Sequence, residues 1–381
     1  MPESSMHDSI VADHVDEQRS LADSKLAKYF EAAVKFQSSD LIMRAGHVPK
    51  LRLKGALKNL DVPPVPSKEF ERAIESSLSE SQWKWYAEHG SIDLGVDFDI
   101  KGDTHRFRVN IFRTRGRSGI AARRVSAEIL NLEDLYMPES MYKLCELHHG
   151  LVLLCGVTGS GKSTTIAALL DHINKNRACH ILTIEDPIEY LFTDKKAIIN
   201  QREVGLDVPT FPIALRALVR ENPDVVLIGE MRDKETFEAA LQAAETGHLV
   251  FGTIHASSAS QAFGRIYDLF PQEEREAIRN LLAYQLQAFV YQKLLPTLMP
   301  DVQRVPAVEI LLQCPPARKF IIEGREDELP EVMKSHREQG MQTFTDSLVD
   351  LVEKQFVHPK VATEVAASPE EIKMRLRGIT A

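Results

Sequence analysis

Apolar positions in the first third of the chain follow helical and strand spacings in turn. A helical spacing starts at Lys25, and two later segments, Ile92–Ile100 and Phe107–Phe112, alternate between apolar and polar residues as half-buried strands do. The prolines at 63–66 interrupt the pattern, and Ser67 after them is expected to cap a second helix. These spacings predict a small mixed α/β domain.

Farther along the chain, continuous apolar runs replace the alternating ones. Helical patterns separate four such runs, at Leu151–Cys155, His180–Ile184, Val225–Ile228 and Leu249–Thr253. Short continuous runs are typical of strands that are buried on both faces of a parallel sheet. A doubly wound α/β domain with a parallel-type sheet is therefore predicted. From about Pro315 the apolar spacing is mainly helical, which indicates a helical C-terminal subdomain.

The patterns divide the 381 residues into five parts. They are a polar tail, an α/β domain, a linker, a second α/β domain and a helical subdomain, at 1–24, 25–125, 126–141, 142–314 and 315–381. A chain of this length has room for two hydrophobic cores, so two folded domains are expected.

The composition is that of an ordinary globular protein, with 44% hydrophobic and 27% charged residues. A net charge of −9 gives no general attraction to nucleic acid. The four cysteines show no C-x-x-C spacing, which argues against a zinc site or a disulfide framework and fits a reducing compartment. No segment approaches the roughly 20 apolar residues of a membrane span, and the first residues lack the pattern of a secretion signal. We therefore expect a cytoplasmic protein with no membrane span of its own.

One segment carries a phosphate-binding motif. Gly156–Ser163 matches G-x-x-x-x-G-K-[ST] and lies between a buried strand and a stretch with helical pattern. Its backbone N–H groups and the end of the helix can bind phosphate oxygens, Lys162 can reach the β- and γ-phosphates, and Ser163 can ligate Mg²⁺. The motif predicts ATP or GTP binding by Gly156, Val157, Thr158, Gly159, Ser160, Gly161, Lys162, Ser163 and Thr164.

Carboxylates follow two other buried strands. Glu230 comes after Val225–Ile228, at the sheet edge where ligands bind in open α/β folds, and could activate the attacking water. The aspartate that usually precedes such a glutamate is replaced by Gly229. The acidic run Glu185–Glu189 follows another strand, and we expect it to supply the missing charge at the same edge. An acidic loop facing solvent is the alternative.

Two histidines, His248 and His255, flank the strand Leu249–Thr253. A strand of that length separates them by roughly 20–23 Å, so they cannot share one metal ion. Either alone is compatible with an ordinary core histidine. Of the two, His255 at the carboxyl end is the candidate for a contact with the γ-phosphate.

Together these segments resemble the secretion-ATPase superfamily, and within it the type IV pilus retraction ATPases of the PilT and PilU type. The matching stretches are GVTGSGKST, TIEDPIEY (183–190), VVLIGEMRD (225–233) and TGHLVFGTIHA (246–256). The resemblance implies a PAS-like N-terminal domain, a RecA-like ATPase domain, and a homo-hexameric ring that hydrolyses ATP with Mg²⁺. It also implies catalytic roles for Glu230, Glu185 and His255, Mg²⁺ contacts from Ser163, Glu185 and Glu230, and nucleotide contacts from Asp186, Glu189 and His248.

A basic stretch in the N-terminal domain gains a meaning from this resemblance. In the family, arginines of this domain reach the γ-phosphate, where positive charge stabilises the transition state. By motif position we expect Arg108 and Arg123 to act in this way, and after them Arg115 or Arg117. A solvated or nucleic-acid-binding basic face is the alternative.

The resemblance further implies retraction of a pilus, because the four-cysteine zinc site usual in assembly and type II secretion ATPases is missing. Expected partners are an inner-membrane pilus platform protein, with the ring peripheral at its cytoplasmic face, and a paralogous pilus ATPase. Residues 317–323 match the family's A-I-R-N-L-I-R-E motif only in part. A PilU-like accessory ring, a structural subunit of a partner motor, or a related secretion or assembly ATPase therefore remain alternatives. A nucleic-acid translocase is opposed by the acidic charge.

Overall fold

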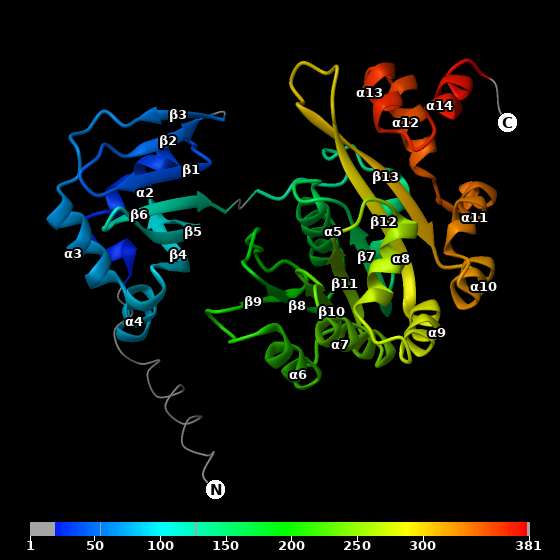
Figure 1. Cartoon of the computed structure of the whole chain (residues 1–381), viewed down its shortest axis with the longest axis horizontal. Helices are drawn as coiled ribbons and strands as arrows, with labels where there is room; N and C mark the ends of the chain where they lie inside the picture. The colour runs from blue at the N-terminus through cyan, green and yellow to red at the C-terminus, as the bar shows by residue number, and fades with distance from the viewer. Residues whose placement is uncertain (1–19, 54, 126–127, 379–381) are drawn as a thin grey trace, which may run out of the picture. The chain divides into compact units, whose positions relative to one another are not determined.

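The computed structural model of the chain describes residues 20–53, 55–125 and 128–378 (Figure 1). It divides into two compact units, with the boundary between Ala127 and Glu128. Most of the predicted tail at 1–24 lies outside the described residues, as do residues 126–127 of the predicted linker. Each unit is described by itself below.

The N-terminal unit is a six-stranded antiparallel sheet in the order β3-β2-β1-β6-β5-β4. Its strands are β1 (Asp40–Arg44), β2 (Lys50–Leu53), β3 (Ala56–Asn59), β4 (Ser91–Ile100), β5 (Asp103–Thr114) and β6 (Arg117–Arg124). Alternate residues of β5 are buried, as the sequence predicts, and Phe107 stacks edge-on against Phe30 and Phe98 in the core. The mixed α/β domain is therefore confirmed. Its core starts earlier than predicted, because Leu21, in the 3-10 turn η2 (Leu21–Asp23), is buried in it.

Helices α2 (Ala27–Lys35), α3 (Ser67–Ser77) and α4 (Glu80–His89) pack on this sheet. The prediction that Ser67 caps a helix was wrong by one residue, since Pro66 occupies the cap and makes no side-chain cap bond. The side-chain cap belongs instead to α4. There Ser79 Oγ accepts the Gln82 N–H at 3.2 Å, and Gln82 Oε1 accepts the Ser79 N–H at 3.0 Å.

The second unit contains a seven-stranded sheet in the order β13-β12-β7-β11-β10-β8-β9. Its strands are β7 (Gly150–Cys155), β8 (His180–Glu185), β9 (Ile198–Glu203), β10 (Val225–Ile228), β11 (Leu249–Ile254), β12 (Leu286–Pro296) and β13 (Arg304–Leu312). All neighbours pair in parallel except β12 and β13, which form an antiparallel hairpin. The doubly wound parallel-type sheet is thus confirmed, with an antiparallel edge that the sequence did not predict.

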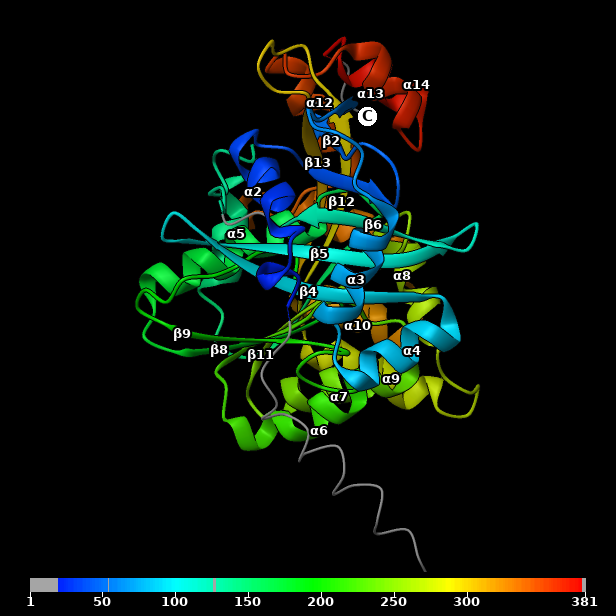
Figure 2. The same ribbon diagram turned by 90° about the vertical axis from the view of Figure 1, so that its left-hand side faces the viewer.

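Helices cover both faces of this sheet (Figure 2). Helix α5 (Lys162–Asn176) packs on one face, against the core that includes Val152, Leu154 and Phe251. The other face packs against α6 (Phe211–Glu221), α7 (Lys234–Glu245), α8 (Ala259–Asp268) and α9 (Arg275–Gln285). Adjacent residues of β7 belong to the two different cores, which explains its uninterrupted apolar sequence.

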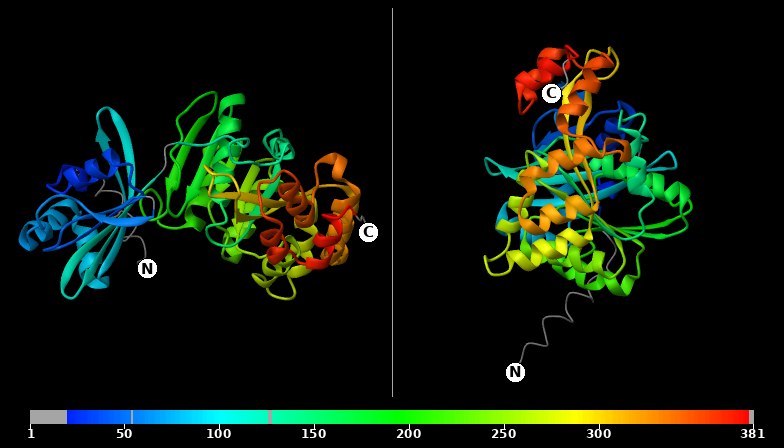
Figure 3. Two further views of the ribbon diagram at one scale, coloured as in Figure 1. Left: turned by 90° about the horizontal axis from the view of Figure 1, so that it is seen from above. Right: turned by 90° about the vertical axis from the view of Figure 1, so that its right-hand side faces the viewer.

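The C-terminal helices do not form one subdomain, as was predicted for 315–381. Helices α10 (Pro315–Glu323) and α11 (Leu329–Ser335) bury Ile321 and Met333 in the core of the large sheet. Only α12 (Phe344–Glu353), α13 (Pro359–Val365) and α14 (Pro369–Arg375) share a separate core, with the far end of the β12–β13 hairpin (Figure 3). Within the described part of the chain, no helix combines the length and apolar character that crossing a membrane requires.

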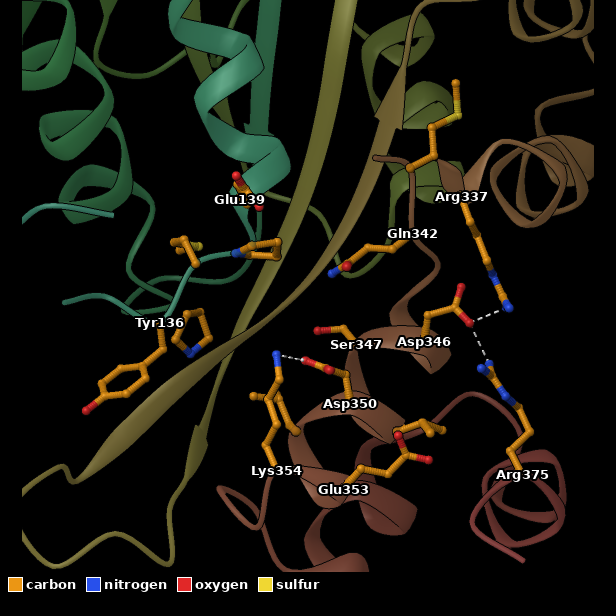
Figure 4. Close-up of a pocket in the computed structure, with 16 residues that line it drawn as sticks. Tyr136, Glu139, Arg337, Gln342, Asp346, Ser347, Asp350, Glu353, Lys354 and Arg375 are labelled. Atoms are coloured by element: carbon orange, nitrogen blue, oxygen red, sulfur yellow. Dashed lines mark hydrogen bonds and ion pairs between the residues drawn. The ribbon is translucent and has the colours of Figure 1, made fainter. Parts of the chain in front are cut away.

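Asp346 ties the last helices together (Figure 4). It accepts hydrogen bonds from the Thr343 backbone N–H at 3.0 Å and from Arg375 at 2.6 Å, and also pairs with Arg337. Burial alone raises the pKa of this carboxyl, but the bonds from Thr343 and Arg375 and the charge of Arg337 hold it below its usual value. The carboxylate thus joins α12, α14 and the turn before α12.

Beside this cluster is a pocket of about 530 Å³, which residues Tyr136–Glu139 also line. The Tyr136 ring lies edge-on to Phe356 with centroids 5.4 Å apart. The described end of the predicted linker at 126–141 is therefore packed against the C-terminal helices.

Candidate active site

The phosphate-binding loop connects β7 to α5, as the sequence predicts. Gly159 and Gly161 have φ angles of 76° and 90°, which favour glycine. A Cβ atom added at Gly156 would lie 2.4 Å from the Gln292 carbonyl oxygen, so strand β12 leaves no room for a side chain there. The glycines thus allow a tight loop whose N–H groups lie at the start of a long helix.

Lys162 lies buried inside this loop. Its Nζ donates to the Gly156 carbonyl at 2.8 Å and lies 3.3 Å from the Val157 carbonyl. Burial lowers the pKa of this ammonium, and the nearby Cys155, Glu230 and Glu189 oppose the shift. The cation is therefore held by weak neutral acceptors, which phosphate oxygens can replace with a stronger, charge-assisted bond.

The first turn of α5 places two hydroxyl groups at the same edge of the sheet. Ser163 is partly exposed there, and the Thr164 hydroxyl lies 2.7 Å from the Tyr190 hydroxyl. Among the described residues, the buried Ser160 hydroxyl has no hydrogen-bond partner. Polar groups are thus available beside the loop.

Glu185 ends β8 and is buried at this edge, with 7% of its surface exposed. Its Oε1 accepts hydrogen bonds from the Thr183 hydroxyl at 2.7 Å and from Gln201 Nε2 at 3.3 Å. Burial raises the pKa of Glu185 to about 7, although these bonds oppose the shift. Such a carboxyl gains from a cation, which would favour its ionised form.

Gly229, which stands where the usual aspartate is missing, lies next to β8. Gly229 N donates to the Ile184 carbonyl at 2.8 Å, so the two strands are in register and Gly229 lies beside Glu185. A Cβ atom on Gly229 would lie 3.2 Å from Glu185 Cα and 3.6 Å from Glu185 Cγ. A side chain at 229 would therefore be crowded by the backbone of β8, and the carboxylate of Glu185 is the one that lies beside Gly229 at this edge.

Glu230 is the second carboxylate at this edge. Its Oε1 lies 3.1 Å from His255 Nε2, and Arg232 pairs with both of its oxygens. Partial burial raises the pKa of Glu230, but the hydrogen bond and charge of Arg232 outweigh this and hold the pKa below its ordinary value. The pKa of His255 is lowered by burial and by the charge of Lys162. An ionised carboxylate beside a neutral imidazole can orient a water molecule and accept its proton.

The residues predicted to bind the nucleotide do not all lie together. Asp186 and Glu189 are exposed on the loop after β8, and Asp186 attracts Arg232. His248 lies at the opposite, amino end of β11, where its Nδ1 is 2.9 Å from the Ala243 carbonyl. The prediction that His248 belongs to this nucleotide site is not supported, because the whole strand separates it from His255.

The predicted arginines lie in the N-terminal unit. Arg108 and Arg123 are directly paired across β5 and β6, and Arg123 Nε lies 3.0 Å from Asp40 Oδ1. Both line a pocket of about 240 Å³ with Asp40 and Asn110. Their side chains are exposed, which leaves Arg108 and the far side of Arg123 available to a ligand. Their role at the γ-phosphate stays a prediction.

Several residues that shape the site were not predicted to belong to it. Gln292 and Gln201 approach from strands far along the chain, Tyr190 contacts α5, and Arg232 pairs with Glu230. Only the strand order shows that β12 and β9 contribute here. Arg232 and Tyr190 lie within the quoted motifs, but nothing in the local sequence of Gln292 or Gln201 distinguishes these two residues.

The described residues hold no group of three or more His, Cys, Asp or Glu side chains placed to bind a metal ion. Proteins bind Mg²⁺ through one or two carboxylates together with phosphate oxygens and waters. Ser163, Glu185 and Glu230 are the residues that could hold it directly or through water. A glycine loop around a buried lysine, with two carboxylates at the same edge of a parallel sheet, defines a P-loop nucleoside triphosphatase.

Comparison with known proteins specifies this class. Residues 86–365 match the family model described as type II/IV secretion system protein. The type IV pilus retraction ATPase PilT of Pseudomonas aeruginosa is 40% identical over 333 residues, which cover 87% of this chain and 95% of PilT. The chain therefore belongs to the type II/IV secretion system protein family, whose members named here are ATPases.

Two further comparisons cover almost the whole chain. The type IV pilus ATPase PilU of the same organism is 36% identical over 351 residues, covering 92% of this chain and 91% of PilU. A crystal structure of the pilus retraction motor PilT with bound ADP superposes with a TM-score of 0.83 at 40% identity, over 92% of this chain and 99% of that one. The fold of both units is thus that of PilT.

Proposed function

We propose that the chain is a Mg²⁺-dependent ATPase that powers the retraction of a type IV pilus. The observation that carries this proposal is the convergence of Lys162, Glu185 and Glu230 at one sheet edge. The similarity to PilT over most of both chains supports retraction as the work that hydrolysis performs.

Each group at the site has a task in this proposal. The loop amides and Lys162 bind the β- and γ-phosphates, and Ser163 with Glu185 holds Mg²⁺, which neutralises phosphate charge when bound. Glu230 is ionised and accepts a proton from the attacking water, while its contact at 3.1 Å keeps His255 beside the same reacting groups. Arg108 and Arg123 complete the site from an N-terminal unit.

If arginines of a neighbouring subunit complete each site, then every subunit needs a neighbour. A closed ring gives each subunit one. We propose a homo-hexamer that acts at the cytoplasmic face of the inner membrane on a platform protein of the pilus. Movement of the N-terminal unit on hydrolysis would carry force to that protein, since the arginines bind the γ-phosphate only before its release.

A second candidate is an accessory ring that works beside a principal motor. It is favoured by the similarity to PilU and by residues 317–323 on α10, which match the retraction motif only in part. In this case the chain would need a paralogous ATPase for its effect on the pilus.

Deletion of the gene from a piliated strain tests the proposal. Excess surface pili with lost surface motility is the expected result, whereas bald cells would overturn retraction in favour of assembly. Restoring the gene with Lys162→Ala separates a motor that must bind ATP from an accessory ring with a purely structural role. A principal motor does not recover motility with this variant, and a purely structural subunit does.

A further inference from the structure

We propose that Gln292 is a positioning residue that fixes the phosphate-facing form of the loop. The inference rests on the proposed function, because it concerns how the same loop binds ATP. Gln292 lies on β12, more than a hundred residues beyond the loop, and is not part of any of the motifs described above. Only 2% of its surface is exposed.

Both ends of the Gln292 amide are used. Nε2 donates to the Ser160 carbonyl at 2.8 Å, and Oε1 accepts from the Thr165 hydroxyl at 2.9 Å. One buried side chain thus joins the end of the loop to the first turn of α5. A hydrophobic residue of the same size would leave the Thr165 hydroxyl and a loop carbonyl without these bonds.

The main chain at Gln292 also supports the loop. Tyr291 pairs with Cys155, the last residue of β7, so β12 continues past the point where the loop begins. A Cβ atom at Gly156 would meet the Gln292 carbonyl oxygen at 2.4 Å, and one at Gly161 would meet Gln292 Nε2 at 2.7 Å. Gln292 therefore lies behind both ends of the loop.

Peptide geometry gives this contact its chemical consequence. In a trans peptide the C=O and the following N–H point in opposite directions. Because Gln292 holds the Ser160 carbonyl on the β12 side, the Gly161 N–H points away from β12, toward the inside of the loop. The same bond thus orients a donor that a phosphate oxygen can use. Without it, this peptide can rotate and the donor is lost.

The experiment compares full-length variants in two assays. Gln292→Glu keeps an acceptor for Thr165 but replaces the amide donor with a carboxylate. Gln292→Met removes both bonds at similar size. Gln313→Met is the matched control, because Gln313 is a glutamine of the same unit that donates to the Ala283 carbonyl at 2.7 Å, on helix α9. Binding of a fluorescent ADP analogue with Mg²⁺ is titrated, and KM and kcat for ATP are measured.

We expect both Gln292 variants to raise the Kd for the ADP analogue and the KM for ATP about tenfold or more, the loss equivalent to one good hydrogen bond. kcat at saturating ATP should change less than threefold, since a bond made equally in the ground and transition states affects binding alone. A merely structural defect would instead reduce the active fraction, lowering kcat with KM unchanged.

Unchanged Kd in folded Gln292 variants would overturn the inference, as would an equal loss in the Gln313 control. If neither Gln292 variant folds, Thr165→Val decides: it removes only the hydroxyl that orients the amide, and normal affinity would then refute the proposal. Wild-type protein that binds no ADP analogue would contradict the proposed function itself, which keeps the two failures distinct.

Discussion

Gly229→Ala adds a single methyl group at the point where the usual aspartate is missing. The new Cβ would lie 3.2 Å from Glu185 Cα and 3.3 Å from the Ile184 carbonyl oxygen. Both are backbone atoms of β8, fixed by the 2.8 Å hydrogen bond from Gly229 N to that carbonyl, so neither can rotate away. Overpacking of this kind costs roughly 1–3 kcal/mol. The variant should lose that much unfolding free energy.

The control is Gly264→Ala, in the same unit. No atom lies within 4 Å of a Cβ atom at Gly264, which is exposed within α8. Alanine there should stabilise the helix by roughly 0.5–1 kcal/mol. Urea unfolding followed by circular dichroism measures both changes, which are expected to have opposite signs. If Gly229→Ala is as stable as wild type, then a side chain fits at 229 and the backbone of β8 does not crowd that position.

Two further changes test the electrostatics. Burial raises the pKa of Glu185 to about 7, so without Mg²⁺ the folded chain keeps a proton that the unfolded chain releases near pH 4.5. As the pH rises from 5 to 7.5, the unfolding free energy of wild type relative to Glu185→Gln should therefore fall by up to about 3 kcal/mol, measured by urea unfolding. A difference between the two proteins that stays constant with pH would contradict this. Asp346→Asn removes the charge shared by Arg337 and Arg375 and should cost about 2 kcal/mol. Asp350→Asn, which breaks only the exposed pair with Lys354, should cost less than about 0.5 kcal/mol, and similar losses would refute the special role of Asp346.

The parts of the fold that the sequence predicts are those with strong local signals. The β7 run is apolar at each position because it packs against a core on each face, and the loop after it carries a distinctive motif. The carboxylates Glu185 and Glu230 follow from the rule that the ends of parallel strands meet at one edge. These features depend on neighbours in sequence or on one general property of sheets.

The parts of the fold and of the site that the sequence does not predict depend on contacts between distant segments of the chain. β12 starts at Leu286, directly after the last residue of α9, so no turn residue marks where the helix ends and the strand begins. The antiparallel pairing of β12 with β13 then forms one edge of the sheet. The packing of α10 and α11 into the large core likewise depends on where that hairpin ends. The separation of His248 from the site follows from strand direction, because His248 and His255 lie at opposite ends of β11.

Phosphate release from Mg-ATP by wild type and Glu230→Gln tests the central claim most directly. Glu245→Gln, an exposed glutamate at the end of α7, is the matched control. Loss of the carboxylate that accepts the proton of the attacking water should lower turnover at least about 100-fold while the Kd for ATP stays within a few fold, and the control should hydrolyse ATP normally. Equal turnover in Glu230→Gln and wild type would contradict the assignment of this edge of the sheet as the site of hydrolysis.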